Sequence, residues 1–209
     1  MKNRIVVVDY HLGNTNSVFN AISGLGYNVV VSNERKDIES SDALIMPGVG
    51  AFGQAMHNIK KLKLESILNE QVLKNKKPVL GICIGMQIMA ESSEENGYHK
   101  GLGWLNGTVK RIIEKDKLVP HVGWNEVNSL INNKIFFSNA VFQNPSFYWD
   151  HSYHFDCSPK HRVATVQYGS TLSAIVARDN IFGVQFHPEK SQTNGLRLLR
   201  SFFNYCNFL

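Results

Sequence analysis

The chain has 209 residues, of which 43% are hydrophobic and 19% are charged, as in ordinary globular proteins. Its formal net charge is +5, but the lysines are scattered and no basic stripe interleaves with aromatic residues, which argues against a nucleic-acid partner. Three widely spaced cysteines argue against a disulfide framework, and the apolar runs are too short for a signal sequence or a membrane span. We therefore expect one cytoplasmic domain, residues 1–209, with reduced thiols and no membrane contact.

The first part of the chain alternates strand and helix patterns. Strands are predicted at residues 4–9, 27–32, 43–46 and 79–82, and helices at 14–25 and 62–75. Asn14 or Thr15 can cap the first helix, and Gly26 can end it. Residues 37–41 are expected to form a short connector. This order predicts a parallel sheet with right-handed crossovers.

The second part of the chain changes to short alternating strands. They are expected at residues 108–113, 124–128, 147–151, 162–168, 173–178 and 181–185. Residues 178–180 read as a hairpin turn, and an amphipathic helix is expected at 194–204. The fold class is therefore α/β, a mostly parallel sheet flanked by helices with an antiparallel portion in the C-terminal half.

The fourth predicted strand runs directly into the pattern Gly81-x-Cys83-x-Gly85. This is the pattern of a nucleophile elbow, a sharp strand-to-helix turn with the nucleophile at its tip. Glycines suit positions 81 and 85 because a Cβ there would collide with neighbouring backbone. The helix N-terminus favours the thiolate, and the amide of Ile84 can bind an oxyanion. The alternative is a buried structural cysteine at the end of a core strand.

Among eight histidines, His187 is the strongest candidate for the base that takes the thiol proton. It follows an apolar strand, and Pro188 keeps its backbone extended, so that Glu189 points to the same side. Glu189 can then accept the Nδ1 proton and leave Nε2 facing Cys83. This is the order of groups that activates a cysteine nucleophile.

His121 and His151 are the rivals for that role. His151 and His154 are three residues apart, so on a strand they would face opposite ways and form a poor metal pair. Cys157 and Cys206 lie in settings that suggest packing. We therefore expect neither a metal nor a cofactor.

The third strand leads into a glycine-rich run, residues 47–53. Such a backbone bends tightly or approaches another group closely. It can be a donor loop at the carboxyl ends of the strands, where open α/β sheets bind ligands. The alternative is a plain loop before a helix.

The motifs taken together resemble those of the class I, or triad, glutamine amidotransferases, a family with a flavodoxin-like fold. The three motifs of that family match residues 47–52, 81–87 and 187–189. Further motifs at residues 9–14, 120–125 and 151–153 resemble the glutaminase subunit family of imidazole glycerol phosphate synthase, an enzyme of histidine biosynthesis. The resemblance runs from about residue 4 to the C-terminus.

The resemblance implies a mechanism and a substrate, L-glutamine. Cys83 would attack the carboxamide, with His187 as base and then acid and Glu189 orienting it, giving glutamate and ammonia. A second set of residues would bind the substrate or the oxyanion: Val49, Gly50, Ile84, Gln87, His151, Ser152 and Tyr153. In the family the Val49–Gly50 peptide must turn inward, which couples activity to a partner, so we expect little activity from the chain alone.

The same resemblance implies a heterodimer. Ammonia would pass through a channel to a (β/α)8 synthase or cyclase subunit, which makes imidazole glycerol phosphate and AICAR, and this chain is too short to contain that barrel. The residues expected at the partner interface or its gate are Asn14, Pro120, His121, Trp124 and Tyr148.

Two departures from the family pattern leave alternatives open. His11 stands where the family usually has glycine, and Trp149-Asp150 stands near the expected partner face where the family prefers apolar residues. The same glutaminase could therefore serve a paralogous synthase that amidates a nucleotide or a surface-sugar precursor. A catalytically dead binding subunit is a second alternative, and another cysteine hydrolase on the same fold is a third.

Overall fold

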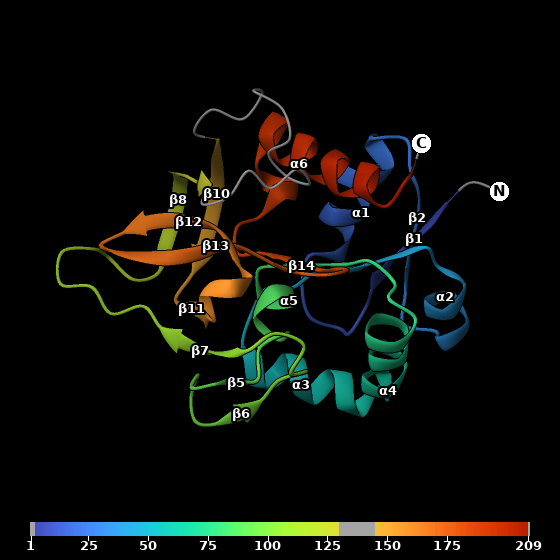
Figure 1. Cartoon of the computed structure of the whole chain (residues 1–209), viewed down its shortest axis with the longest axis horizontal. Helices are drawn as coiled ribbons and strands as arrows, with labels where there is room; N and C mark the ends of the chain where they lie inside the picture. Colours follow the sequence, from blue (N-terminus) through green and yellow to red (C-terminus); the bar gives the residue numbers. More distant parts are fainter. Residues whose placement is uncertain (1–2, 130–144, 209) are drawn as a thin grey trace.

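The structure, a computed structural model, describes residues 3–129 and 145–208. Its central sheet has the strand order β2-β1-β3-β4-β14-β13-β12-β9 (Figure 1). The strands are β1 (Arg4–Val8), β2 (Asn28–Ser32), β3 (Ala43–Met46), β4 (Val79–Ile82), β9 (Asn128–Ser129), β12 (Arg162–Tyr168), β13 (Ser170–Arg178) and β14 (Ile181–Val184). The strands from β2 to β14 in that order are parallel, and β13, β12 and β9 continue antiparallel. The predicted fold class is confirmed.

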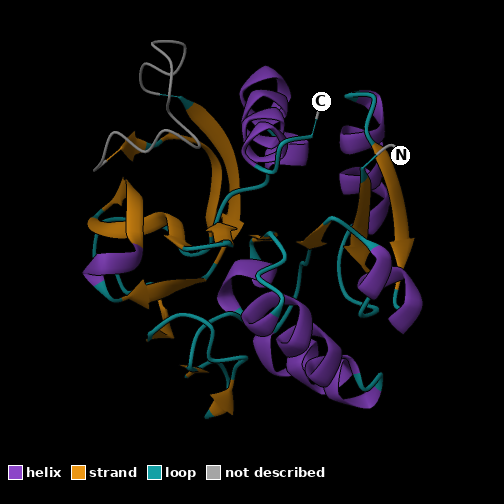
Figure 2. Ribbon diagram, turned by 45° about the vertical axis from the view of Figure 1, so that its right-hand side comes forward, coloured by secondary structure: helices purple, strands orange, loops and turns teal. Residues whose placement is uncertain are grey.

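Helices cover both faces of this sheet (Figures 1 and 2). They are α1 (Thr15–Gly24), α2 (Arg35–Ser40), α3 (Phe52–Lys61), α4 (Leu64–Asn69), α5 (Ile84–Gln87) and α6 (Gln192–Tyr205), with a π-helical turn at Glu70–Lys74 and 3-10 turns at Pro159–His161 and Pro188–Lys190. Side chains alternate along β1: Ile5 and Val7 join the core under α1 and α6, whereas Val6 and Val8 join the core under α2, α3 and α4. The continuous apolar run of β1 is explained by this burial on both faces.

Two smaller sheets stand beside the central one (Figure 1). One has the order β11-β7-β5-β6 and the other pairs β10 with β8. Their strands are β5 (Ser92–Ser93), β6 (His99–Lys100), β7 (Gly107–Arg111), β8 (His121–Glu126), β10 (Ser146–His151) and β11 (Tyr153–Cys157). The backbone N–H of His187, just beyond β14, donates to Tyr148 O in β10 over 2.9 Å. This bond ties the smaller sheet to the carboxyl end of the parallel strands.

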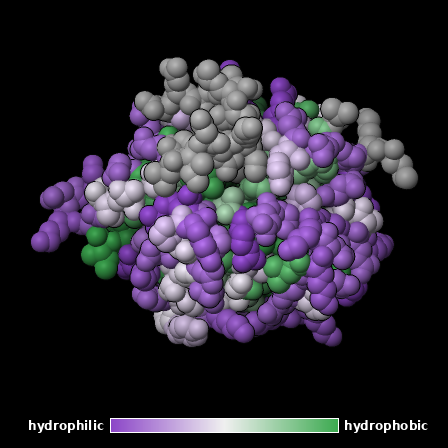
Figure 3. Space-filling view, in the orientation of Figure 1, coloured by the Kyte–Doolittle hydropathy of each residue, from purple (hydrophilic) through white to green (hydrophobic). Residues whose placement is uncertain are grey.

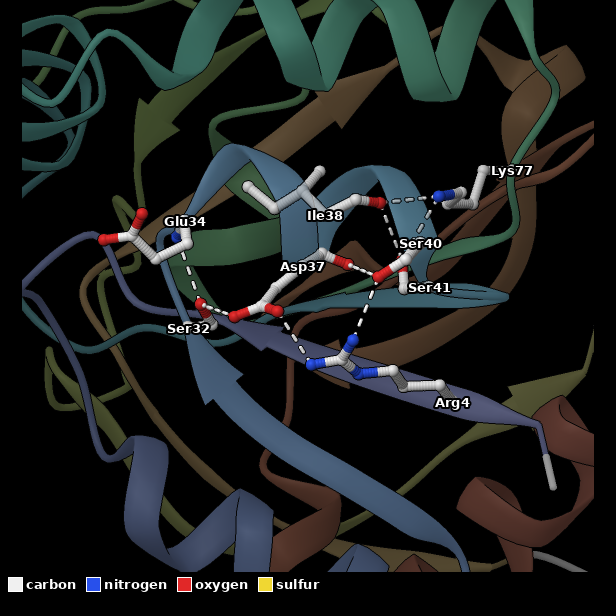
Figure 4. A network of polar contacts seen from close by, with 8 residues as sticks. All are labelled: Arg4, Ser32, Glu34, Asp37, Ile38, Ser40, Ser41 and Lys77. Atoms are coloured by element: carbon white, nitrogen blue, oxygen red, sulfur yellow. Dashed lines mark hydrogen bonds and ion pairs between the residues drawn. The ribbon is translucent and has the colours of Figure 1, made fainter. Parts of the chain in front are cut away.

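The expected connector at residues 37–41 is wrong, because helix α2 occupies most of it. Only Ile38 of this short helix is buried, so hydrophobic spacing gives almost no signal. Polar contacts hold it instead (Figure 4): Lys77 Nζ donates to Ile38 O over 2.6 Å, and Arg4 reaches Asp37 over 2.8 Å and Ser40 over 2.9 Å. Such contacts arise from tertiary structure and are invisible in a local pattern.

The helix predicted at residues 62–75 is correct only in part, because α3 precedes it and a break at Lys63 divides the two. Lys63 has a φ of 57°, in the left-handed region. The α3 helix buries Phe52, Ala55, Met56 and Ile59, the i, i+3, i+4, i+7 spacing of one helical face. The glycine-rich run that leads into α3 obscured that signal.

The visible surface is mainly hydrophilic (Figure 3). A hydrophobic patch marks the edge where the loop between β7 and β8 lies, and Ile113 and Leu118 in that loop are 85% and 87% exposed. Within residues 3–129 and 145–208, none of the helices has the length and apolar character needed to cross a bilayer.

Candidate active site

Cys83 stands at the turn between β4 and α5, as the elbow pattern predicts. Its backbone has φ 52° and ψ −109°, a conformation that costs a non-glycine residue roughly 1–3 kcal/mol. Its N–H donates to Val184 O over 2.8 Å, so the end of β14 holds the turn. The α5 helix has four residues, which is enough to place the amide of Ile84 at a helix start, where it has no intrahelical acceptor.

The two elbow glycines are required by close backbone approach. A Cβ on Gly81 would lie 2.5 Å from Gly85 O, and a Cβ on Gly85 would lie 1.7 Å from Met46 O. Atoms cannot approach so closely, so each site excludes every side chain. The elbow geometry is thus a direct consequence of the glycine spacing.

The imidazole of His187 and the carboxylate of Glu189 form a buried pair. Nδ1 of His187 lies 2.8 Å from Oε1 of Glu189, and the two side chains are 1% and 2% exposed. The carboxylate therefore accepts the Nδ1 proton and leaves Nε2 as the reactive nitrogen. That Nε2 atom is buried and makes no hydrogen bond of ordinary geometry within the described residues.

The electrostatics favour a protonated His187. Burial alone would lower the pKa of His187, but interaction with the Cys83 thiol and with Glu189 outweighs burial and raises it to about 10. Proton transfer from the thiol to the ring would then give a thiolate beside an imidazolium. This is the reactive form of a cysteine nucleophile.

A cavity of about 280 Å³ opens onto Cys83, a size suited to a small metabolite rather than a macromolecular ligand. Its lining residues are Val49, Gly50, Cys83, Ile84, Gln87, Glu95, Pro120, Asp150, His151, Ser152 and Tyr153. The lining includes all seven residues predicted to bind substrate or oxyanion. His187 and Glu189 do not line it. Within the described ranges, no cluster of three or more histidine, cysteine or acidic side chains is placed to hold a metal ion.

Gln87 and Tyr153, which both line the cavity, are joined by a hydrogen bond. Nε2 of Gln87 donates to Tyr153 O over 2.8 Å and to Oε1 of Gln185 over 3.1 Å. Nδ1 of His151 also lies 2.8 Å from Tyr153 O. Both amide protons of Gln87 are therefore used within the protein, and its Oε1 is the atom left to meet a ligand.

His121 and His151 form a neutral hydrogen-bonded pair. Because Nδ1 of His151 donates to a carbonyl, its Nε2 accepts from Nδ1 of His121, 3.0 Å away. Nε2 of His121 then accepts from Asn125 over 3.3 Å. Burial lowers the pKa of His121 to about 4, and burial together with the neighbouring His121 and His187 lowers the pKa of His151 to about 3. Both rings are therefore neutral and weakly basic at neutral pH, which makes them poorer bases than His187.

The glycine-rich loop packs tightly beside the elbow. A Cβ on Gly48 would lie 2.3 Å from Cγ2 of Ile84 and 2.5 Å from the Tyr10 hydroxyl, and that buried hydroxyl donates to Pro47 O. Val49 is partly exposed at the cavity, and Gly50 has a φ of 112°. A backbone in this region favours glycine, so the Val49–Gly50 peptide sits at a position with conformational freedom.

The residues expected at a partner interface or its gate lie on different elements of the structure. Trp124 is half exposed on β8, pairs with Tyr148 of β10, and makes an edge contact with its ring. Pro120 lines the cavity mouth. Asn14 caps α1 by accepting from Ser17 N, as predicted.

His121, expected at the partner interface or its gate, is buried. Its ring lies between the rings of Trp149 and Tyr168, with centroids 5.0 and 3.8 Å away. Residues alternate along β8, so Val122 and Trp124 face outward where His121 faces inward. His121 can reach a partner only through its neighbours.

Trp149 and Asp150, where the sequence departs from the family pattern, differ in exposure. Trp149 is fully buried and donates from Nε1 to Asn125 O over 3.2 Å, so only Asp150 is exposed, at the cavity. His11, the other departure, has a φ of 57°, a conformation that glycine adopts without cost.

Two site residues were missed by reasoning from the sequence. Glu95 lies in the cavity wall and accepts from Phe52 N over 2.6 Å. Gln185 is fully buried, and its Nε2 lies 3.7 Å from Sγ of Cys83. The available signal for Gln185 was a polar residue at the end of a predicted apolar strand, two positions before the proposed base.

Comparisons with known proteins point to one family. The family described as glutamine amidotransferase class-I matches residues 6–206. Imidazole glycerol phosphate synthase subunit HisH 2 of Vibrio vulnificus is 46% identical over 204 residues, covering 97% of this chain and 94% of the relative. The subunit HisH 2 of Methanococcus maripaludis is 42% identical over 200 residues, covering 95% and 98%.

Solved structures agree at the level of the fold. PurLQS from Thermotoga maritima has a TM-score of 0.74 at 18% identity, covering 98% of this chain and 99% of that chain. From the family match and the identity to these relatives, the chain belongs to the class-I glutamine amidotransferase family and, within it, to the family of the imidazole glycerol phosphate synthase subunit HisH.

Proposed function

We propose that this chain, acting as a single domain, hydrolyses L-glutamine to glutamate and ammonia with Cys83, His187 and Glu189. The observation that carries the proposal is a strained cysteine facing a small cavity, backed by a buried histidine whose other nitrogen is held by a carboxylate. Family membership adds the reaction class, because class-I glutamine amidotransferases take ammonia from glutamine.

The chemistry proceeds through a thioester. The Cys83 thiolate attacks the carboxamide carbon, and the oxyanion accepts hydrogen bonds from the amide of Ile84 and from the Val49–Gly50 peptide. The imidazolium of His187 then gives its proton to the departing nitrogen, so that ammonia leaves and a γ-glutamyl thioester remains. His187 next takes a proton from water, which attacks the thioester and releases glutamate and the thiol.

The cavity lining suits an amino-acid substrate. An α-ammonium group needs an acceptor, which the carboxylate of Glu95 and the Oε1 atom of Gln87 provide. The segment of His151, Ser152 and Tyr153 also lines the cavity. These groups would fix the substrate along its length and bring its carboxamide to Cys83.

We propose that the outward face of β8 and β10 binds a (β/α)8 synthase or cyclase subunit to form a heterodimer in the cytoplasm. Half-exposed Val122 and Trp124 lie there beside Tyr148, and an exposed indole is a typical interface anchor. Pro120 joins this face to the cavity. Asn14 and, indirectly, His121 are assigned to the same interface or its gate.

The product is assigned to histidine biosynthesis, where the partner would use ammonia to make imidazole glycerol phosphate and AICAR. One observation favours the second candidate, a paralogous synthase that amidates a nucleotide or surface-sugar precursor. Asp150 is exposed and lines the cavity, near the expected partner face where the family prefers apolar residues. The barrel protein that co-purifies with this chain separates the two candidates.

The experiment measures glutamate release by the chain alone and with its barrel partner, for the wild type and Cys83→Ala. We expect little release by the chain alone, strong release by the pair, and none above background with Cys83→Ala. Equal rates for wild type and variant would end the proposal and favour a subunit that only binds. Full turnover by the isolated chain would refute the coupling through the Val49–Gly50 peptide.

A further inference from the structure

Gln185 makes a contact with the nucleophile that the mechanism above does not use. Its side chain is fully buried and is absent from the cavity lining. Nε2 of Gln185 lies 3.7 Å from Sγ of Cys83, within the range of an N–H···S hydrogen bond. The residue thus meets the sulfur from inside the protein rather than from the substrate side.

The orientation of the Gln185 amide is fixed by its neighbours. Its Oε1 accepts from Nε2 of Gln87 over 3.1 Å, and Gln87 also donates to Tyr153 O. Gln87 uses its NH₂ group as the donor to both Tyr153 O and Gln185 Oε1. Turning the Gln185 amide over would therefore bring two NH₂ groups together and point the Gln185 carbonyl at the sulfur. The backbone N–H of Gln185 donates to Ala174 O over 2.9 Å. The end of Gln185 that faces Cys83 is therefore the hydrogen-bond donor.

We propose that Gln185 is a positioning residue that donates a hydrogen bond to the Cys83 thiolate. The inference rests on the proposed role of Cys83 as the nucleophile. A donor aimed at sulfur favours the charged form of the thiol, and His187 supplies a second interaction with the same atom. Two protein groups would thus hold the sulfur in place before it attacks, and the Gln185 amide, unlike His187, keeps its protons throughout the reaction.

The test follows alkylation of Cys83 by iodoacetamide as a function of pH, with the modified peptide resolved from those of Cys157 and Cys206 by mass spectrometry. Gln185→Met keeps the length of the side chain and removes the donor. Gln185→Glu keeps the shape and places an oxygen against the sulfur. Both variants are measured in the full chain, which makes the readout independent of glutamine turnover.

The matched control is Asn180→Leu. Asn180 is also a buried amide, at the other end of β14, and its Nδ2 donates to Val72 O and Lys77 O over 2.9 and 2.8 Å. We expect Gln185→Met to raise the midpoint of Cys83 alkylation by about one pH unit, which is about a tenfold loss of thiolate below the midpoint. Gln185→Glu should raise it further, and Asn180→Leu should leave it unchanged even if the protein melts earlier.

Kinetics with the barrel partner give a second readout. For Gln185→Met we expect a fall of about tenfold in kcat and a smaller rise in KM for glutamine, because Gln185 does not line the cavity but accepts a hydrogen bond from Gln87, which does. An unchanged alkylation midpoint in both Gln185 variants, or a change in KM alone, would overturn the proposal. A wild-type pair with no glutaminase activity would defeat the proposed function instead and leave the alkylation result standing.

Discussion

Glu189→Gln is the sharpest perturbation of the proposed site, because it keeps the shape of the side chain and removes one charge. The carboxylate lies 2.8 Å from Nδ1 of His187, and both side chains are almost fully buried. A hydrogen bond to a charged group contributes about 1.5–3 kcal/mol. If that energy is lost in the transition state, kcat falls by about 10- to 150-fold.

The assay is glutamate release by the pair of subunits at saturating glutamine. Glu91→Gln is the matched control, because Glu91 is an exposed acid that also accepts two hydrogen bonds, from Asn106 and from the backbone of Gly107. We expect the control to retain the wild-type kcat. A Glu189→Gln variant with kcat within twofold of wild type would refute the role given to the buried pair.

The same pair links stability to pH. The pKa of His187 is raised from 6.5 to about 10 in the folded protein, so the stability it adds is present below pH 6.5 and is lost as pH rises towards 10. Loss of the carboxylate lowers that folded pKa. We therefore expect chemical unfolding of Glu189→Gln to show this loss ending at a lower pH than in the wild type, and identical curves would contradict the coupling.

Three other predictions concern the elbow, acid pH and the contacts of α2. Gly85→Ala should cost more than about 4 kcal/mol, because its Cβ would lie 1.7 Å from Met46 O; a variant with wild-type thermal unfolding would contradict the elbow. The pKa values of His121 and His151 are lowered to about 4 and 3, so stability should fall as pH drops below 6.5, by about 1.4 kcal/mol per pH unit for each. When unfolding by urea is measured at several pH values, the stability of His121→Phe should fall less steeply with decreasing pH than that of the wild type. Equal slopes for the two proteins would show that His121 does not titrate in this way. Lys77→Met should cost about 1–3 kcal/mol, since it removes the Nζ donor from Glu39 O and leaves Ile38 O with the Ser41 hydroxyl; an unchanged urea midpoint would mean that Lys77 does not hold α2.

Local pattern was sufficient for the parallel strands and for the elbow. Burial on both faces makes β1 and β3 continuously apolar, and the collisions at Gly81 and Gly85 leave glycine as the residue that fits. Both are constraints that act within a few residues. They therefore leave a trace that can be read without the fold.

Tertiary contacts explain what the sequence did not reveal. Helix α2 is held by Lys77 from a distant segment, and Glu95 and Gln185 acquire their places from groups far away along the chain. The burial of His121 had a usable signal, since Val122 and Trp124 alternate with it along β8. Alternation shows which residues share a face, but the fold decides which face is exposed.

The claim on which the proposed function depends is that the Cys83 sulfur forms a bond with the glutamine carbonyl. The direct measurement mixes the pair of subunits with glutamine, quenches it in acid and determines the modified residue by peptide mass spectrometry. We predict a γ-glutamyl adduct on Cys83 that is absent from Cys83→Ala. Undiminished glutamate release by Cys83→Ala, with no adduct on the wild-type cysteine, would contradict it.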